Sequence, residues 1–437
     1  ESLFGMEEVK WTDIKNNMPL YDVTFPYIRM MAGPVDYTPG AMRNATKADW
    51  RAVYYSPMSM GTRCHQLAAY IVHDSPTNYL NEQECVDFIT SIPVETDSTF
   101  IAAGKMGEYI VSVRKKDINW YIGGMTNWDE RDVELDFSFL PSNVRYTATL
   151  FADGINANKQ AEDYRTEKLI IDKNSRIKIH LASGGGFAMK LELYPVRGEV
   201  TSIPERKNIP SFYKKYIETE GLYVTSSEKV SDEALLKACD IISLMLSKRP
   251  DVKAHMVKKG CHVMVIGKDE DTCDLPEFAH ICNSPDSIAY WNWRARGFGG
   301  APEDEFSASC GEENLLALPQ DKYTGENILI HEFAHLIHMV GIAGVEPDFN
   351  DRLEVLWKSA GEKGLWAGTY ALSNKEEYFA ECVQSFFNCN RYADPANGIH
   401  NSMNRRVKLK AYDPEMYKLL KEYFYEIEIP INNEIHK

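Results

Sequence analysis

The pentapeptide His331-Glu332-Phe333-Ala334-His335 constrains this chain more than any other stretch of the sequence. It matches the pattern H-E-x-x-H. On a helix, residues four positions apart lie on one face, so the two imidazoles can bind one zinc ion while Glu332 acts as a general base. Gly341 predicts the end of this helix. The flanking apolar residues recur at helical spacing: Ile328, Leu329, Phe333, Leu336, Ile337 and Val340.

A catalytic zinc site also needs a third protein ligand. The variant H-x-x-G-x-x-H would require glycine at position 338 and histidine at position 341, but the chain has His338 and Gly341. That class is therefore excluded, and His338 is predicted to be a partly exposed helix residue. The alternative is a chance match, in which His331 and His335 are ordinary helix residues.

A second helix is predicted to supply the third ligand. Ser373 and Glu376 form a capping-box pattern at its start. Glu377 and Glu381 lie four residues apart on one face, so one carboxylate can bind the metal while the other accepts a ring N–H from a ligating histidine. A solvated acidic face is the alternative. The apolar stripe of this helix consists of Phe379, Cys382, Val383 and Phe386.

These two segments together resemble the catalytic domain of anthrax lethal factor and its relatives, which are zinc metallopeptidases of the gluzincin type. In that family H-E-F-x-H is followed by Tyr, six residues, a ligand Glu and then F/Y-F-A-E. This chain has Tyr370, six residues, Glu377 and Tyr-Phe-Ala-Glu381. The resemblance covers about residues 325 to 390 and implies the following roles: zinc ligands His331, His335 and Glu377, general base Glu332, oxyanion donor Tyr370, and Glu381 behind the ligands.

The beginning of the chain shows a different pattern. Residues 25–40, F-P-Y-I-R-M-M-A-G-P-V-D-Y-T-P-G, are predicted to form a buried strand that ends in a Pro/Gly loop, and residues 64–72 a helix. This order suits a βα repeat. Together with residues 55–63 and 74–79, these stretches resemble the end of the catalytic barrel of glycoside hydrolase family 97, the α-glucosidase and α-galactosidase family.

Residues 98 to 196 are rich in predicted strands. Short strands at this spacing predict an antiparallel sandwich, and the family 97 resemblance implies such a C-terminal domain. The predicted strands are residues 108–114, 120–125, 145–151, 169–171 and 187–193.

The resemblance implies only part of the glycosidase chemistry. Glu7 corresponds to a catalytic acid and Glu1 to a calcium ligand, although Phe4 stands where the family has Arg. Glycoside hydrolysis needs a second carboxylate, which would lie on strands before residue 1. The region is therefore interpreted as a scaffold or as a fragment of a longer enzyme, and ordinary surface acids are the alternative for Glu1 and Glu7.

The remaining segments are predicted from periodicity and turn residues. They are a linker at 198–210, a helix at 231–246, a buried strand at 262–267, a loop at 296–300, and a strand at 314–318 that would pair with an extended substrate.

Composition limits the possible partners. The 437 residues carry a net charge of −16, which argues against a nucleic-acid or anionic-membrane partner. No run of about 18 apolar residues was recognised, so no membrane span is expected. Nine cysteines without a C-x-x-C pair argue against a cysteine-built metal site, and some of them suit disulfides in a secreted or periplasmic protein.

The sequence therefore predicts a multidomain α+β chain. Residues 1–96 are expected to be a partial family 97-like barrel, 97–197 an antiparallel β-sandwich, and 205–437 a mostly helical, zincin-like metallopeptidase domain. The predicted function is zinc-dependent hydrolysis of a peptide or protein, with carbohydrate as a further partner and calcium in the family 97-like region. The alternatives are an α-glycosidase of family 97 whose N-terminal part is missing from this chain, and a non-enzymatic scaffold that binds carbohydrate or a partner.

Overall fold

The computed structural model describes residues 17–28, 43–53, 55–56, 58–73, 83–142, 144–205, 207–300 and 306–429. The chain divides into two compact units, Glu1–Tyr194 and Pro195–Lys437, and each is described by itself. Both combine helices with sheets, which confirms a multidomain α+β chain with antiparallel sheets. The predicted limits 1–96, 97–197 and 205–437 remain predictions.

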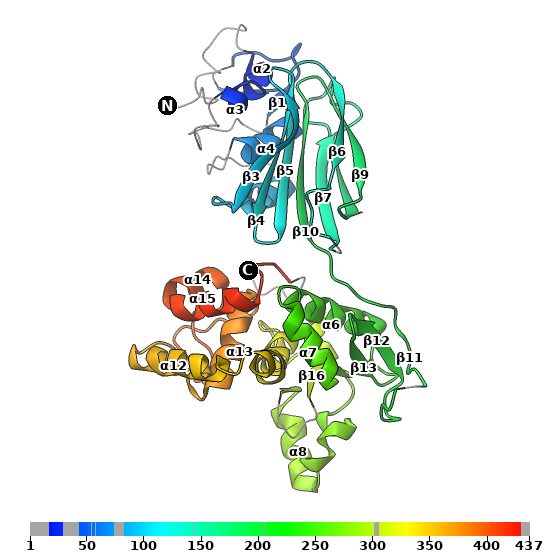
Figure 1. The fold of residues 1–437 in the computed structure, drawn as a ribbon, viewed down its shortest axis with the longest axis vertical. Coiled ribbons are helices and arrows are strands. Elements are labelled where there is room, and N and C mark those ends of the chain that lie inside the picture. Colours follow the sequence, from blue (N-terminus) through cyan, green and yellow to red (C-terminus); the bar gives the residue numbers. More distant parts are fainter. Residues whose placement is uncertain are drawn as a thin grey trace. The chain divides into compact units, whose positions relative to one another are not determined.

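The first unit contains short helices followed by long strands (Figure 1). Its helices are α2 (Met18–Asp22), α3 (Phe25–Ile28), α4 (Arg63–Val72) and α5 (Gln83–Ser91). Its strands are β1 (Asn44–Ala45), β2 (Ser59–Met60), β3 (Ser98–Lys105), β4 (Tyr109–Lys116), β5 (Asn119–Thr126), β6 (Arg131–Asp136), β7 (Tyr146–Asp153), β8 (Tyr164–Ile171), β9 (Arg176–Leu181) and β10 (Gly186–Leu193).

An antiparallel sheet in the order β3-β4-β5-β10-β7-β8 forms the centre of this unit. Strands β6 and β9 pair separately and contact β3, β7 and β10 of the large sheet. Along both strands, buried apolar residues alternate with exposed polar ones, as expected when one face of a strand pair is covered. The strands predicted at 108–114, 120–125, 145–151, 169–171 and 187–193 are confirmed.

Helix α4 packs against β4, β5, β7 and β10, and all ten of its residues are buried. Its N-cap is Thr62, whose hydroxyl accepts a hydrogen bond from the N–H of His65 (3.2 Å). The helix predicted at 64–72 is therefore confirmed. The strand predicted from residue 25 is wrong for Phe25–Ile28, which is helical, because a short apolar run has no periodicity that separates strand from helix. Residues 29–40 lie outside the described residues.

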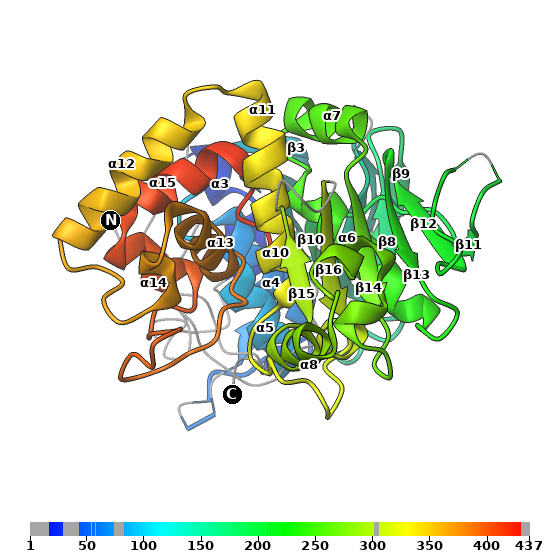
Figure 2. The ribbon, with the colours of Figure 1, turned by 90° about the horizontal axis from the view of Figure 1, so that it is seen from below.

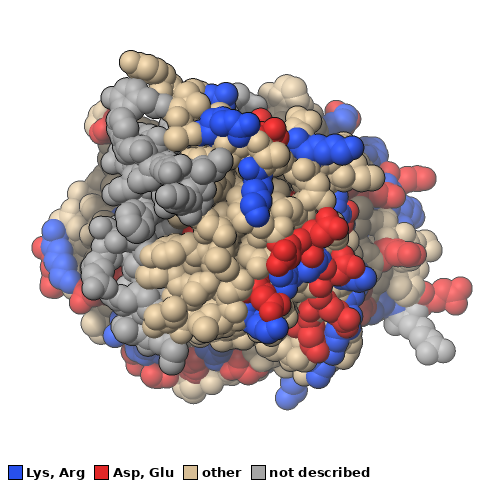
Figure 3. Space-filling view, turned by 90° about the horizontal axis from the view of Figure 1, so that it is seen from above, with Lys and Arg blue, Asp and Glu red and all other residues tan. Residues whose placement is uncertain are grey.

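The outer face of the β6–β9 pair carries cross-strand ion pairs. Arg176 contacts Asp136 at 2.8 Å, and Lys178 contacts Asp132 at 2.7 Å. On the face shown in Figure 3, Lys and Arg side chains lie among Asp and Glu side chains at one side, next to a broad area that carries neither. Exposed ion pairs of this kind stabilise strands only weakly. They account for the polar outer face of β6 and β9 but not for the pairing of the two strands.

The second unit contains a mixed sheet and a group of helices (Figures 1 and 2). Its strands are β11 (Thr201–Ser202), β12 (Lys215–Thr219), β13 (Leu222–Ser226), β14 (His262–Ile266), β15 (Gly297–Gly299) and β16 (Ser307–Gly311). Its helices are α6 (Asp232–Met245), α7 (Pro250–Lys259), α8 (Pro285–Arg294), α9 (Glu312–Leu315), α10 (Ile328–Leu336), α11 (Ala343–Val345), α12 (Phe349–Glu362), α13 (Lys375–Phe386), α14 (Arg406–Tyr412) and α15 (Pro414–Tyr423).

This sheet has the order β11-β12-β13-β14-β16-β15. Strands β13, β14 and β16 are parallel, whereas the edge strand β15 is antiparallel to β16. Helix α10 contacts β15 and β16 on one side and α13 on the other, as Figure 2 shows. The predicted helix 231–246 and strand 262–267 are confirmed by α6 and β14.

Two predictions near the sheet edge are wrong. The loop predicted at 296–300 contains strand β15, and the strand predicted at 314–318 begins within helix α9. Buried acids explain the helical turn. Glu312 accepts hydrogen bonds from the backbone N–H groups of Ser231 and Lys268, and Glu313 forms a bidentate pair with Arg296 at 2.7 and 2.9 Å. These contacts depend on residues distant in sequence.

The helix that carries the H-E-x-x-H motif does not end at Gly341 as predicted. It continues through a π-helical turn, Ile337–Ile342, into α11. A side chain at position 341 would approach Val252 of α7 to 2.8 Å, so the glycine permits close helix packing here. The whole segment Ile328–Val345 is long and apolar enough to cross a membrane by length and composition, contrary to expectation, but 67% of it is buried within the protein, as in a core helix.

One buried carboxylate, Asp153, joins several elements of the first unit. The hydroxyl of Thr62 donates to its Oδ1 at 2.6 Å, and the backbone N–H groups of Ala182 and Gly186 donate to its Oδ2, each at 2.9 Å. Burial raises the pKa of Asp153 to about 6, although these hydrogen bonds oppose the rise. Since Asp153 ends β7, Thr62 caps α4 and Gly186 begins β10, this side chain fixes a helix and two strands together.

Substitution Asp153→Ala is expected to destabilise the first unit by roughly 2–5 kcal/mol, because three buried donors lose their acceptor. Hydrogen–deuterium exchange of the β7 and β10 amides measures this loss. The exposed carboxylate Glu95 provides a control, and Glu95→Ala should change stability by less than about 0.5 kcal/mol. Unchanged protection in Asp153→Ala would contradict the assigned role.

Candidate metal centre

Helix α10 presents His331 and His335 from a fixed N-terminus. The side chain of Asn327 caps the helix by accepting a hydrogen bond from the N–H of Ile330 (2.9 Å). Asn314 accepts a second one from the N–H of Ile328 (2.7 Å). Most of the other residues of the helix are buried, which fixes the direction in which the two histidines point.

Helix α13 presents Glu377 from its first turn. The N-cap is Asn374, whose Oδ1 accepts a hydrogen bond from the N–H of Glu377 (2.7 Å). The predicted capping box at Ser373 and Glu376 is therefore wrong: the helix begins one residue later, with Asn374 as its N-cap. Helices α10 and α13 pack against each other, and this packing places the Glu377 carboxylate beside the two imidazoles.

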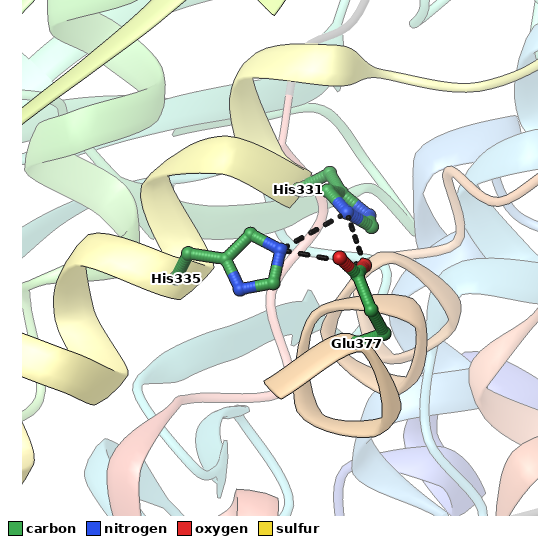
Figure 4. A group of neighbouring side chains, drawn as sticks. All are labelled: His331, His335 and Glu377. Atoms are coloured by element: carbon green, nitrogen blue, oxygen red, sulfur yellow. Dashed lines mark hydrogen bonds and ion pairs between the residues drawn. The ribbon is translucent and has the colours of Figure 1, made fainter. Parts of the chain in front are cut away.

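Three electron-pair donors converge where these helices meet (Figure 4). His331 Nε2 lies 3.1 Å from Glu377 Oε2 and 3.2 Å from His335 Nε2, and His335 Nε2 lies 3.4 Å from the same Glu377 oxygen. Ligand atoms around a tetrahedral divalent ion with bonds of about 2.0–2.2 Å lie ~3.3–3.6 Å apart. The three atoms thus have nearly the spacing of one face of such a tetrahedron, and they form a candidate metal-binding group.

The pKa values reflect how closely these groups are packed. Burial lowers the pKa of His331, but its hydrogen bond to Glu377 and the nearby charges of Glu332 and Glu381 outweigh burial and raise the pKa to about 10. Burial raises the pKa of the Glu377 carboxyl, but the two histidines outweigh this effect and hold it well below its usual range. A metal ion and a proton therefore compete for the position between His331 and Glu377.

Glu332 and Tyr370 lie close to the three donors. Burial raises the pKa of Glu332, and the histidines His331 and His335 oppose the rise. Burial also raises the pKa of Tyr370, which the charge of Glu377 and a hydrogen bond to it raise further. The structure therefore brings both predicted residues to the site, while their roles as general base and oxyanion donor remain predictions.

Glu381 does not occupy the position predicted for it. Its Oε1 lies 3.8 Å from His331 Nδ1, which is too long for a hydrogen bond. Gln384 instead accepts from His331 Nδ1 at 3.0 Å. Gln384 was not predicted, although it lies one further helical turn along the face that carries Glu377 and Glu381.

Behind the three donors lies a buried group of charged residues. His400 lies 3.7 Å from Glu381 and 3.4 Å from Glu326, and Asn390 donates to Glu381 at 2.9 Å. Burial lowers the pKa of His400, but the two carboxylates outweigh it and raise the pKa to about 9. Glu326 and His400 gave no sequence signal, because each comes from a segment without a regular pattern.

His338 is not part of this candidate metal-binding group. It is fully buried between Phe349 and Phe379, contrary to the predicted partial exposure, and its Nε2 lies 2.8 Å from Asn350 Oδ1. Burial lowers its pKa to about 4. This third histidine of the segment therefore packs in the core between aromatic rings.

The edge strand β15 lies directly against the motif helix. A Cβ atom at Gly299 would lie 2.0 Å from the carbonyl oxygen of Glu332, and one at Gly297 would lie 2.6 Å from Ile328 Cγ2. The glycines of this segment thus allow the strand backbone to touch the helix backbone beside the candidate ligands.

Comparison with known protein families gives a match within the first unit. The family model described as "Glycosyl-hydrolase 97 C-terminal, oligomerisation" matches residues 95–192. A retaining alpha-galactosidase from Bacteroides thetaiotaomicron is 47% identical over 200 residues, which cover 44% of this chain and 30% of that protein. The chain therefore spans less than a third of this relative's length.

Two solved structures are also similar to part of the chain. One is a glycoside hydrolase family 97 enzyme from Pseudoalteromonas sp. in complex with acarbose, which is 26% identical with a TM-score of 0.36 and covers 40% of this chain and 29% of that one. The other is a beta-arabinopyranosidase, 18% identical with a TM-score of 0.33, which covers 40% of this chain and 28% of that one.

These findings correct the main functional prediction. The matched family model is a glycoside hydrolase domain and the curated relative is an alpha-galactosidase, so the predicted zinc metallopeptidase and its resemblance to lethal factor are wrong as an account of this chain. The predicted zincin-like fold, the peptide substrate and zinc as the main cofactor are likewise unsupported. The family 97-like alternative is better supported, through the C-terminal domain at residues 95–192.

Substitution Gly299→Ala is expected to destabilise the second unit by about 1–3 kcal/mol, because the added methyl group must push β15 away from α10. Gly361, in helix α12, provides a control, since a Cβ atom there would make only an ordinary contact at 3.7 Å. Gly361→Ala should be neutral or stabilise by up to about 1 kcal/mol. Equal thermal stability of the two variants would contradict the close approach.

Proposed function

We propose that the first unit forms the C-terminal part of an α-glycosidase related to family 97. The observation that carries this proposal is the 47% identity to the retaining alpha-galactosidase over 200 residues. The name of that relative suggests an α-galactoside as substrate, so carbohydrate is the proposed partner. Because the chain spans 30% of that protein, activity is proposed for the first unit only in combination with the part that it does not span.

The proposed residues of this chemistry are Glu7 as catalytic acid and Glu1 as calcium ligand. Both lie outside the described residues, and they rest on the sequence pattern alone. Calcium is accordingly the ion proposed for the first unit.

We also propose that the second unit binds a divalent metal ion through His331, His335 and Glu377. The supporting observation is the spacing of 3.1–3.4 Å among three electron-pair donors. Two imidazoles and one carboxylate suit first-row transition metals better than calcium, which prefers oxygen ligands. The nearby carboxylates of Glu332 and Glu381 would further favour a cation.

A secreted or periplasmic location is a further proposal. It is supported by the disulfide Cys273–Cys282, since disulfides persist mainly in oxidising compartments. The other seven cysteines are buried and form no disulfide in the structure.

A chimera tests the glycosidase proposal. Residues 1–192 of this chain replace the corresponding C-terminal part of the Bacteroides alpha-galactosidase. The chimera is expected to hydrolyse an aryl α-galactoside, and Glu7→Gln in it should reduce turnover by at least ~100-fold, because an essential proton donor is lost. The 437-residue chain alone is expected to show no turnover. A folded but inactive chimera, or an active Glu7→Gln chimera, would refute the proposal.

Titration with Co²⁺ tests the metal proposal, because its visible absorption reports coordination by protein ligands. One equivalent is expected to bind. His335→Ala and Glu377→Gln should weaken binding by more than the ~10–100-fold that loss of an outer partner costs, because a direct ligand is removed. The exposed His280 provides a control, and His280→Ala should bind Co²⁺ like the unchanged protein. Equal affinity in all variants would rule out this site.

A further inference from the structure

The second ring nitrogen of His331 has an unexpected partner. His331 Nδ1 lies 3.0 Å from Oε1 of Gln384, a fully buried residue of α13. A neutral amide therefore occupies the place where a carboxylate commonly orients a ligating histidine. This contact determines which nitrogen of His331 faces Glu377 and His335.

The direction of the Gln384 amide is fixed by a second contact. Its Nε2 donates to the backbone carbonyl oxygen of Asn327 at 3.0 Å. If the amide were reversed, its oxygen would face that carbonyl oxygen, and two acceptors would oppose each other in a buried place. The amide oxygen is therefore the atom that faces His331.

This direction fixes the proton on His331. Because Gln384 Oε1 can only accept, Nδ1 must be the donor. In the neutral imidazole, the lone pair then lies on Nε2, which is the atom 3.1 Å from Glu377 and 3.2 Å from His335. Only this tautomer can bind a metal between the three donors.

Glu381 is in a poorer position than Gln384 to accept the proton of His331 Nδ1. Its Oε1 lies 3.8 Å from His331 Nδ1, and its Oε2 accepts a hydrogen bond from Asn390 at 2.9 Å and lies 3.7 Å from His400. Its carboxylate is thus held mainly by the group behind the site.

We propose that Gln384 is the positioning residue that holds His331 in its metal-binding tautomer; this inference rests on the proposed metal site. Gln384 also links the ligand to the N-cap of α10, because the Asn327 residue whose carbonyl it contacts caps that helix. Metal affinity and order at the start of α10 are therefore coupled through one side chain.

Variants at position 384 separate orientation from packing. Gln384→Met keeps the size of the side chain but removes the acceptor, whereas Gln384→Glu keeps the acceptor and loses the donor to Asn327. Gln384→Met should weaken Co²⁺ binding by ~10–100-fold, while Gln384→Glu should stay within about threefold of the unchanged protein. Gln384→Glu should nevertheless lower the melting temperature, because its carboxylate would replace the amide donor and face the buried carbonyl oxygen of Asn327 as a second acceptor.

Two further residues on α13 complete the comparison. Glu376→Gln is the control and should leave Co²⁺ affinity unchanged. Glu381→Gln should weaken it less than Gln384→Met does. The proposal is overturned if Gln384→Met binds Co²⁺ normally, if both Gln384 variants lose affinity in proportion to stability, or if Glu381→Gln causes the larger loss.

A second measurement does not depend on metal binding. Nitrogen-15 NMR of the histidine side chains should show a His331 Nδ1 proton protected from exchange in the metal-free protein. Glu381→Gln should keep this signal and Gln384→Met should lose it. If the protein fails to bind Co²⁺ but shows this pattern, the metal proposal fails while the role of Gln384 stands; loss of the signal in Glu381→Gln alone would refute that role.

Discussion

The second unit is organised by the meeting of His331, His335 and Glu377 between two helices. Three atoms that carry lone pairs lie within 3.4 Å of one another in a largely buried place. Such an arrangement is unfavourable unless a positive charge lies among them. The raised pKa of His331 favours a proton at this position, and a divalent ion would provide the positive charge more completely. Any ion that binds only the folded state would also stabilise the contact between α10 and α13.

Neighbouring side chains and the edge strand β15 hold these three residues in place. Gln384 and the Glu381–His400–Glu326 group support the ligands from behind, and β15 closes against the helix from the other side. Since the glycines of β15 leave no side chains between strand and helix, the position of Glu332 depends on backbone packing. The candidate metal centre is therefore a property of the folded second unit as a whole rather than of the H-E-x-x-H motif alone.

The sequence predicted this convergence because helical spacing is local. Positions 331 and 335 must share a face, and a second helix with Glu377 needed only to pack against them. Gln384, His400 and the strand at 297–299 were missed or misassigned, because their roles depend on contacts between segments far apart in the chain. Five strands of the first unit were predicted from local runs of apolar residues, whereas β3, β6 and β9 were missed.

The functional prediction failed for a different reason. A short motif determines which atoms can meet at a metal, but it does not determine the family or the substrate of the chain. The longer matches outweigh it: residues 95–192 of the first unit fit the family 97 C-terminal model, and the alpha-galactosidase relative shares 47% identity over 200 residues of the chain. The two units thus support two separate proposals, glycoside chemistry for the first and metal binding for the second.

Anomalous X-ray diffraction from crystals soaked in Co²⁺ tests the metal site most directly. The account predicts one strong anomalous peak at about 2.0–2.2 Å from His331 Nε2, His335 Nε2 and Glu377 Oε2 together. A fully occupied peak elsewhere in the second unit, or no peak at these three atoms at saturating Co²⁺, would contradict it.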